Sequence, residues 1–230
     1  MNKSDTYREP DGSLNYLLEL KLDHSNRVAD DSTLIATELG WSQDDINIAT
    51  AIGILHDVGR FSQFKEFNTF FDGKSVNHGK RGYEVAQTCS VLDECDNNTH
   101  QAILDSIHFH NCRDLPTGLN EDSYRFLNLI RDADKIDIVY IVNHAITNNL
   151  HEKYPQIMLD INLDGPVTPE LLKEIQETGT GSYKHVNSLA DMNLMRLTWI
   201  SNINYAPSLK IFSDRKLMEG LIESIPSSPE

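Results

Sequence analysis

The stretch AIGILHDVGRF, residues 51–61, ends an apolar run with a histidine and an aspartate side by side. Apolar residues recur at helical spacing and predict a buried helix: Ile48, Ile52, Leu55 and Val58. A buried charge is costly unless it is paired, hydrogen-bonded or bound to a metal. His56 and Asp57 are therefore expected to be held in one of these ways. Gly59 is expected just past the helix end, where a left-handed backbone is easily adopted.

Helical periodicity dominates the rest of the 230-residue chain, and runs of alternating β-branched residues are weak. The pattern predicts an all-α protein, organised as a single-domain helical bundle. We expect a loop over residues 61–77. The predicted helices cover residues 14–39 (as one helix or two), 44–58, 78–94, 99–110, 122–146, 168–177, 188–202 and 213–224.

The composition limits the partners of the chain. Its 35 acidic residues outnumber its 20 basic ones and give a formal net charge of −15, which disfavours binding to nucleic acid. A small anionic substrate remains compatible where basic residues or metal ions reverse the charge locally. The sequence predicts no membrane span and no secretory signal, and three cysteines without metal-type spacing favour a reducing cytoplasm.

Helical projection indicates which of two neighbouring histidines faces the core. On a helix over residues 99–110, His110 lies roughly 30° from the apolar direction and His108 roughly 130° from it. We therefore expect His110 to point inward and His108 to point outward.

The same projection applies to the helix predicted over residues 122–146. It puts Asp134 and Asp137 on the apolar side and Asp132 on the opposite side. Separate helices thus carry a set of inward ionisable residues: His24, His56, Asp57, His110 and Asp134.

One metal centre would satisfy this whole set. A single core histidine or aspartate is more often hydrogen-bonded to backbone or paired with an arginine, but several together are hard to satisfy in a small core. Imidazole and carboxylate ligands without cysteine suit Mn, Fe, Co or Ni better than a closed structural zinc site. Mg²⁺ stays an alternative.

The order His24, His56-Asp57, Asp134 resembles the H…HD…D signature of the HD-domain superfamily of metal-dependent phosphohydrolases. The local contexts agree: LDHSNRVA, ILHDVGRF and RDADKID. The resemblance implies that these four residues hold a divalent metal inside an all-helical bundle. The resemblance covers residues 14–146, which it implies form an HD-type core. Around it we expect an N-terminal extension (1–13), additional helices of the same domain (147–224) and a frayed tail (225–230).

Two further histidines resemble the H…HD…H…H…D subset, which binds a second metal. His78 stands in SVNHGKRGYEVA and His110 in AILDSIHFHN, with His108 as the rival to His110. The resemblance implies two divalent metal ions bridged by Asp57. Asp57 would then be the catalytic residue that orients the attacking water.

Basic residues beside these ligands are candidates for binding substrate: Arg60, Lys80 and Arg81. The expected activity is hydrolysis of a phosphate ester or anhydride, in a nucleotide or another small phosphorylated metabolite, by metal-activated water. The alternatives are a mononuclear nucleotidase in which His78 and His110 only shape the pocket, a diiron oxygenase, and a catalytically silent nucleotide-sensing or binding module. The oligomeric state stays open.

Overall fold

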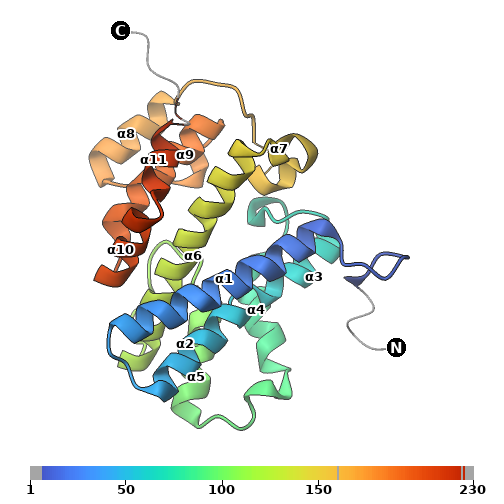
Figure 1. The fold of residues 1–230 in the computed structure, drawn as a ribbon, viewed down its shortest axis with the longest axis vertical. Helices are drawn as coiled ribbons and strands as arrows, with labels where there is room; N and C mark the ends of the chain where they lie inside the picture. Colours follow the sequence, from blue (N-terminus) through green and yellow to red (C-terminus); the bar gives the residue numbers. More distant parts are fainter. Residues whose placement is uncertain (1–6, 160, 224, 226–230) are drawn as a thin grey trace. The chain divides into compact units, whose positions relative to one another are not determined.

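The structure is a computed structural model that describes residues 7–159, 161–223 and 225. Its regular secondary structure is helical, and the described residues contain no strand beyond two isolated bridges, Arg8–Leu14 and Asn162–Ser188. The prediction of an all-α fold is confirmed (Figure 1). Residues 1–6 of the predicted extension, and the predicted tail apart from residue 225, lie outside the described residues.

The chain divides into two compact units, Met1–Asp134 and Lys135–Glu230. The single-domain organisation and its boundaries stay a prediction. The first unit contains α1 (Tyr16–Glu38), α2 (Gln43–Leu55), α3 (Val58–Phe67), α4 (His78–Gln87), α5 (Asn97–Phe109) and the beginning of α6 (Glu121–Thr147), with short 3-10 turns at Asp72–Lys74 and Ser90–Leu92.

Helices α1 and α2 pack side by side (Figure 1). Asn15 caps α1 by accepting a hydrogen bond from the backbone N–H of Leu17, and Ser42 caps α2 by accepting one from Asp45. Where they approach, a Cβ at Gly53 would lie 2.5 Å from the Cα of Ala29, so only glycine fits. This contact places His24 of α1 near the C-terminal end of α2.

The predicted helix over residues 44–58 and the predicted loop over 61–77 are wrong in part. Helix α2 ends at Leu55, and a new helix, α3, runs over Val58–Phe67. The two residues between them are His56 and Asp57. Periodicity missed the break because apolar residues continue at helical spacing across it.

Gly59 does not end a helix, contrary to the prediction. It lies inside α3, where α3 crosses α4. A Cβ there would lie 2.3 Å from the carbonyl oxygen of His78 and 2.5 Å from the backbone nitrogen of Gly82. The glycine is therefore required by close packing of two helices. The left-handed residue that ends α3 is Asn68, with φ of 52°.

The second unit contains the end of α6 and a set of shorter helices: α7 (Leu150–Lys153), α8 (Pro169–Thr178), α9 (Leu189–Leu197), α10 (Ala206–Asp214) and α11 (Leu217–Glu223), with 3-10 turns at Pro155–Met158, Tyr183–His185 and Thr198–Asn202. Helix α11 packs on α9 and α10, and α8 packs on α9.

Three of the predicted helix boundaries are corrected. The helix predicted over 78–94 ends at Gln87, and that over 188–202 becomes a 3-10 turn from Thr198. The helix predicted over 213–224 begins only at Leu217, because Lys216 has a left-handed backbone with φ of 52°. Helix α10 was not predicted.

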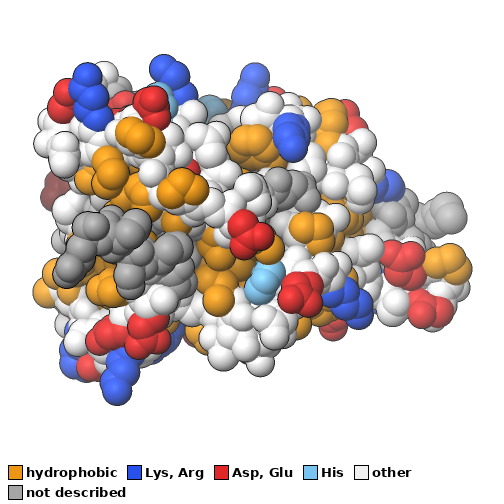
Figure 2. Space-filling model, turned by 90° about the horizontal axis from the view of Figure 1, so that it is seen from above, with side chains coloured by type: hydrophobic (Ala, Val, Ile, Leu, Met, Phe, Trp, Pro, Cys, Tyr) orange, Lys and Arg blue, Asp and Glu red, His pale blue; other side chains and the backbone are white. Residues whose placement is uncertain are grey.

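No described helix combines the length and the apolar character that crossing a membrane requires. Figure 2 shows one face of the molecule, on which Lys and Arg side chains lie scattered among acidic and hydrophobic ones. The described Lys and Arg side chains on this face do not form a continuous basic patch.

Candidate metal centre

Four side chains from three parts of the first unit form a first cluster: His24, His56, Asp57 and Asp134. Nε2 of His24 lies 3.5 Å from Oδ2 of Asp57 and 3.2 Å from Oδ1 of Asp134. Nε2 of His56 lies 3.8 Å and 3.7 Å from the same two oxygens, and 3.2 Å from Nε2 of His24. These nitrogen and oxygen atoms converge on one point.

The other oxygen of Asp57 belongs to a second cluster, formed by Asp57, His78 and His110. Its Oδ1 lies 3.5 Å from Nε2 of His78 and 3.7 Å from Nε2 of His110. The two ring nitrogens lie 3.1 Å apart. Asp57 therefore presents one carboxylate oxygen to each cluster.

In three of the histidine rings, a hydrogen bond at Nδ1 fixes the orientation of the ring and so directs Nε2. Nδ1 of His56 donates to the carbonyl of Gly53 at 2.8 Å, and Nδ1 of His110 donates to that of Ile107 at 2.8 Å. Nδ1 of His78 donates to the carboxylate of Asp72 at 2.7 Å. Since these partners only accept, each Nδ1 carries a hydrogen and each Nε2 faces the clusters.

The second cluster thereby shows that the donor set fits a cation. Burial and the charge of Arg60 lower the pKa of His78 to about 3, so the ring is neutral near pH 7. With its hydrogen on Nδ1, the neutral ring of His78 turns the lone pair of Nε2 toward Nε2 of His110, 3.1 Å away. A metal ion at this point would bind that lone pair, and outer hydrogen bonds of this kind are typical of metal-bound imidazoles.

Both carboxylates of the clusters are ionised at neutral pH. Burial raises the pKa of Asp57, but Lys21, His56 and Arg60 outweigh it and hold the pKa well below its usual range. Burial acts in the same direction on Asp134, where His24 and His56 outweigh it. The ionised carboxylate is the form that binds divalent metals.

The structure thus brings all six predicted ligands together. It places His108 elsewhere: its ring stacks on Tyr83, with centroids 4.8 Å apart, and is half-buried. The helical projection therefore predicted the position of His110 and of His108 correctly. The assignment of the six as metal ligands stays a prediction.

The predicted substrate-binding residues have different surroundings. Nε of Arg60 lies 3.4 Å from Oδ1 of Asp57, and its NH1 donates to Asp72 at 2.9 Å. Lys80 is exposed on α4, and Arg81 pairs with Glu66 at 2.9 Å. Among the described residues, only Arg60 of these three touches a predicted ligand.

The projection of α6 is wrong for Asp132, which is buried with 0% exposure. Asp137 is also buried, as predicted. The error arises because buried residues surround this part of the helix on all sides: Phe126, Leu127, Leu129, Ile130, Ala133, Ile136 and Val139. A single apolar direction therefore does not describe it.

Sequence reasoning missed three residues that contact the clusters. Nζ of Lys21 lies 3.0 Å from Oδ2 of Asp57, Asp72 accepts from His78, and Nδ2 of Asn111 lies 3.2 Å from Nδ1 of His78. The sequence did contain an indication for Lys21, because it stands three residues before His24 and so lies on the same helix face. Asp72 lay in the segment expected to be a loop.

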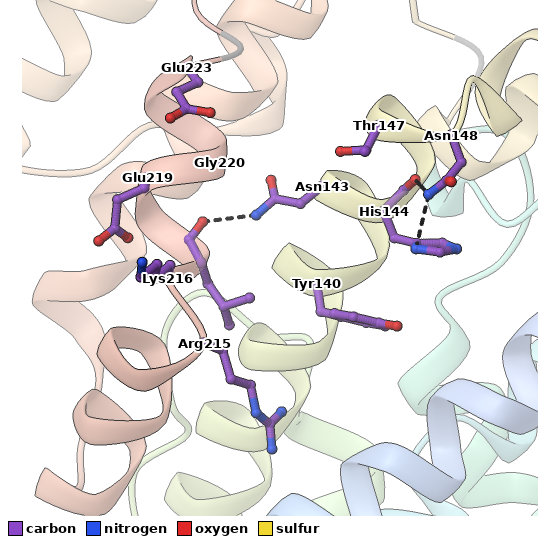
Figure 3. A pocket seen from close by; sticks show the side chains of 11 residues that line it. Tyr140, Asn143, His144, Thr147, Asn148, Arg215, Lys216, Glu219, Gly220 and Glu223 are labelled. Atoms are coloured by element: carbon purple, nitrogen blue, oxygen red, sulfur yellow. Dashed lines mark hydrogen bonds between the residues drawn. The ribbon is translucent and has the colours of Figure 1, made fainter.

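A pocket of about 390 Å³ lies within the second unit, between the C-terminal half of α6 and the start of α11 (Figure 3). Asn143 reaches across it and donates to the carbonyl of Leu217 at 2.9 Å, and Arg215 and Lys216 also line it. None of the predicted site residues lines this pocket.

Comparison with known proteins identifies the family. The model of the HD domain matches residues 22–139, a range that includes all six clustered residues. No curated protein and no solved structure matches the chain. The HD superfamily consists largely of metal-dependent hydrolases. Because the match covers more than half of the sequence, the chain belongs to the HD domain family.

Proposed function

We propose that this protein is a phosphohydrolase that uses two divalent metal ions to cleave a phosphate ester or anhydride of a nucleotide or another small phosphorylated metabolite. The observation that carries the proposal is the division of the Asp57 carboxylate. One oxygen faces His24, His56 and Asp134, and the other faces His78 and His110. A carboxylate shared in this way is suited to bridge two ions.

The six residues would hold the metals as two sets that meet at Asp57. Divalent ions at such a site lower the pKa of water towards 7 and neutralise phosphate oxygens. Asp57, ionised and buried, would orient the attacking water. The absence of cysteine from the set favours Mn, Fe, Co or Ni over Zn.

Lys21 is our candidate for contact with the substrate phosphate. Its ammonium group lies 3.0 Å from Asp57 and 5.7 Å from the ring centre of Phe70, and its side chain is 14% exposed. An ammonium has three hydrogens, and Asp57 takes one of them. The remaining donors lie beside the metal clusters, in a chain that is otherwise strongly acidic.

Arg60 has a positioning role in this proposal. Its NH1 donates to the side chains of Asp72 and Gln63 and to the carbonyl of Phe70. Asp72 in turn accepts from Nδ1 of His78. Arg60 therefore holds the carboxylate that orients His78. Substrate binding by Lys80 and Arg81 stays a prediction.

Metal analysis tests the number of ions. We expect about two equivalents in the purified wild-type protein, about one in His110→Ala, and two in the matched control His108→Ala. One equivalent in wild type would favour the mononuclear alternative. Loss of metal in His108→Ala but not in His110→Ala would contradict the ligand assignment.

A substrate screen tests the reaction. Nucleotides, dinucleotides and simple phosphate esters are incubated with Mn²⁺, Co²⁺, Ni²⁺ or Mg²⁺, and released phosphate or nucleotide is measured. We expect turnover of at least one compound and its loss in Asp57→Asn. No turnover by protein with two bound metals would instead favour the oxygenase or the silent binding module.

A further inference from the structure

Arg196, on α9 of the second unit, is a buried cation without an acidic partner. The residue is 3% exposed. Its NH1 donates to Oδ1 of Asn193 at 3.1 Å, and its Nε has no hydrogen-bond partner. Among the described residues, no Asp or Glu side chain pairs with it. A buried guanidinium in this state is costly.

Two other arginines of the chain show the usual pairing with an acid. Arg125 binds Asp45 at 2.8 Å, and Arg81 binds Glu66 at 2.9 Å. The acidic residue of α9 cannot serve Arg196 in the same way. The carboxylate of Asp191 accepts hydrogen bonds from Thr168 and from the backbone N–H of Asn187.

Arg196 keeps its charge despite this environment. Burial lowers the pKa of its guanidinium to about 10, which still leaves the group protonated near pH 7. A guanidinium presents parallel N–H groups that match the oxygens of phosphate and carboxylate. The chemistry that would complete the site is that of an oxyanion.

We propose that Arg196 binds the phosphate or carboxylate group of a small ligand, which supplies the counter-ion that the described residues lack. The amide of Asn193 accepts from NH1, and Nε is the buried donor that has no hydrogen-bond partner. Arg196 belongs to the second unit, whereas the residues of the metal clusters all belong to the first.

The test is anion-dependent thermal stability of the full-length protein. Inorganic phosphate and acetate are titrated separately against chloride at constant ionic strength, and Tm is recorded. At about five times its Kd, a bound anion should raise Tm by about 2–4 °C. Saturation by phosphate, by acetate or by both identifies the oxyanion that the site accepts.

Two variants test whether Arg196 is responsible for the anion-dependent rise in Tm. Arg196→Met removes the charge while keeping a long side chain. It should lose the saturable shift, whereas Arg215→Met, which removes an exposed arginine of the pocket in Figure 3, should retain it. Arg196→Gln gives the same comparison if the methionine variant does not fold.

Three results would overturn the proposal. The first is a wild type that neither anion stabilises. The second is a shift retained in Arg196→Met, which would place the anion elsewhere, at the metal clusters for example. The third is a shift lost in Arg215→Met and kept in the Arg196 variants, which would assign the anion to the pocket.

Discussion

At the scale of single residues, the centre depends on which atom of each side chain faces inward. The Nδ1 atoms of His56 and His110 are tied to carbonyls one turn earlier in their own helices, and that of His78 to Asp72. Their Nε2 atoms are thereby aimed at Asp57 before any ligand binds. Preorganisation of this kind lowers the cost of binding a metal.

Lys21→Met tests the residue that the sequence did not predict. We expect kcat/KM for the substrate found by screening to fall about 10–100-fold, since a charge-assisted hydrogen bond contributes about 1.5–3 kcal/mol. Metal content should stay at the wild-type value. Lys21→Arg should recover part of the loss, and unchanged kinetics in Lys21→Met would contradict a role in phosphate binding.

At the scale of helices, the crossing of α3 and α4 sets the spacing between the clusters. Asp57 immediately precedes α3, and His78 is the first residue of α4. The two helices come this close because Gly59 has no side chain. The distance between Asp57 and His78 therefore depends on a residue that itself carries no chemistry.

Gly59→Ala should change the free energy of unfolding in the direction opposite to the usual one for this substitution in a helix. Replacing an interior helical glycine by alanine ordinarily stabilises a protein by about 0.5–1 kcal/mol. Here the new Cβ meets backbone atoms of α4, so we expect the free energy of unfolding to fall by about 1–3 kcal/mol. Urea denaturation measures it, with Lys65→Ala on the exposed face of α3 as the control. A stabilised variant would refute the packing argument.

Asp191 connects the first turns of α8 and α9. It accepts from Thr168, the N-cap of α8, and completes a capping box with Ser188, the N-cap of α9. Burial raises its pKa, but the hydrogen bonds from Thr168, Asn187 and Ser188 outweigh it, and the net shift is downward. The two short helices are thus held by one carboxylate.

Asp191→Ala should lower the free energy of unfolding by about 1–3 kcal/mol at pH 7. Because the folded pKa lies below the unfolded value of about 3.9, this stabilisation is present above that pH and is lost as the pH falls through the folded pKa. The difference between wild type and variant should therefore shrink below about pH 4. Asp214→Ala, which removes an exposed ion pair with Lys210, is the control and should have little effect.

At the scale of the whole molecule, the net charge of −15 favours divalent cations over polyanions. The carboxylates and imidazoles of the candidate metal centre also favour divalent cations. Metal binding should thus be linked to stability, and it should weaken as ionic strength rises.

Metal removal should lower Tm. A metal present at about 100 times its Kd stabilises the folded chain by about 2.7 kcal/mol, which corresponds to about 5–11 °C for a protein of this size. Differential scanning calorimetry with Mn²⁺ and with a chelator measures the difference. Asp57→Asn should show a much smaller response, and an equal Tm in both buffers would argue against a structural link between metal and fold.

Local patterns in the sequence were sufficient for much of this protein. Periodicity predicted the all-α class and most helices, because the burial of one helix face repeats every three to four residues. The resemblance named the six residues that the structure brings together, since each stands in a recognisable local context. The position of His110 rather than His108 followed from helix geometry alone.

Tertiary packing decided what no local pattern encodes. The break between α2 and α3 lies within continuous apolar periodicity, and the need for Gly59 comes from α4, about 20 residues further along the chain. The contact of Lys21 with Asp57 and the lack of an acidic partner for Arg196 depend on residues distant in sequence. The sequence by itself determined the helical class, most helices and the candidate ligands, because these follow from interactions between near neighbours. Only the folded chain decided how the ligands divide around Asp57, because that division depends on how separate helices approach one another.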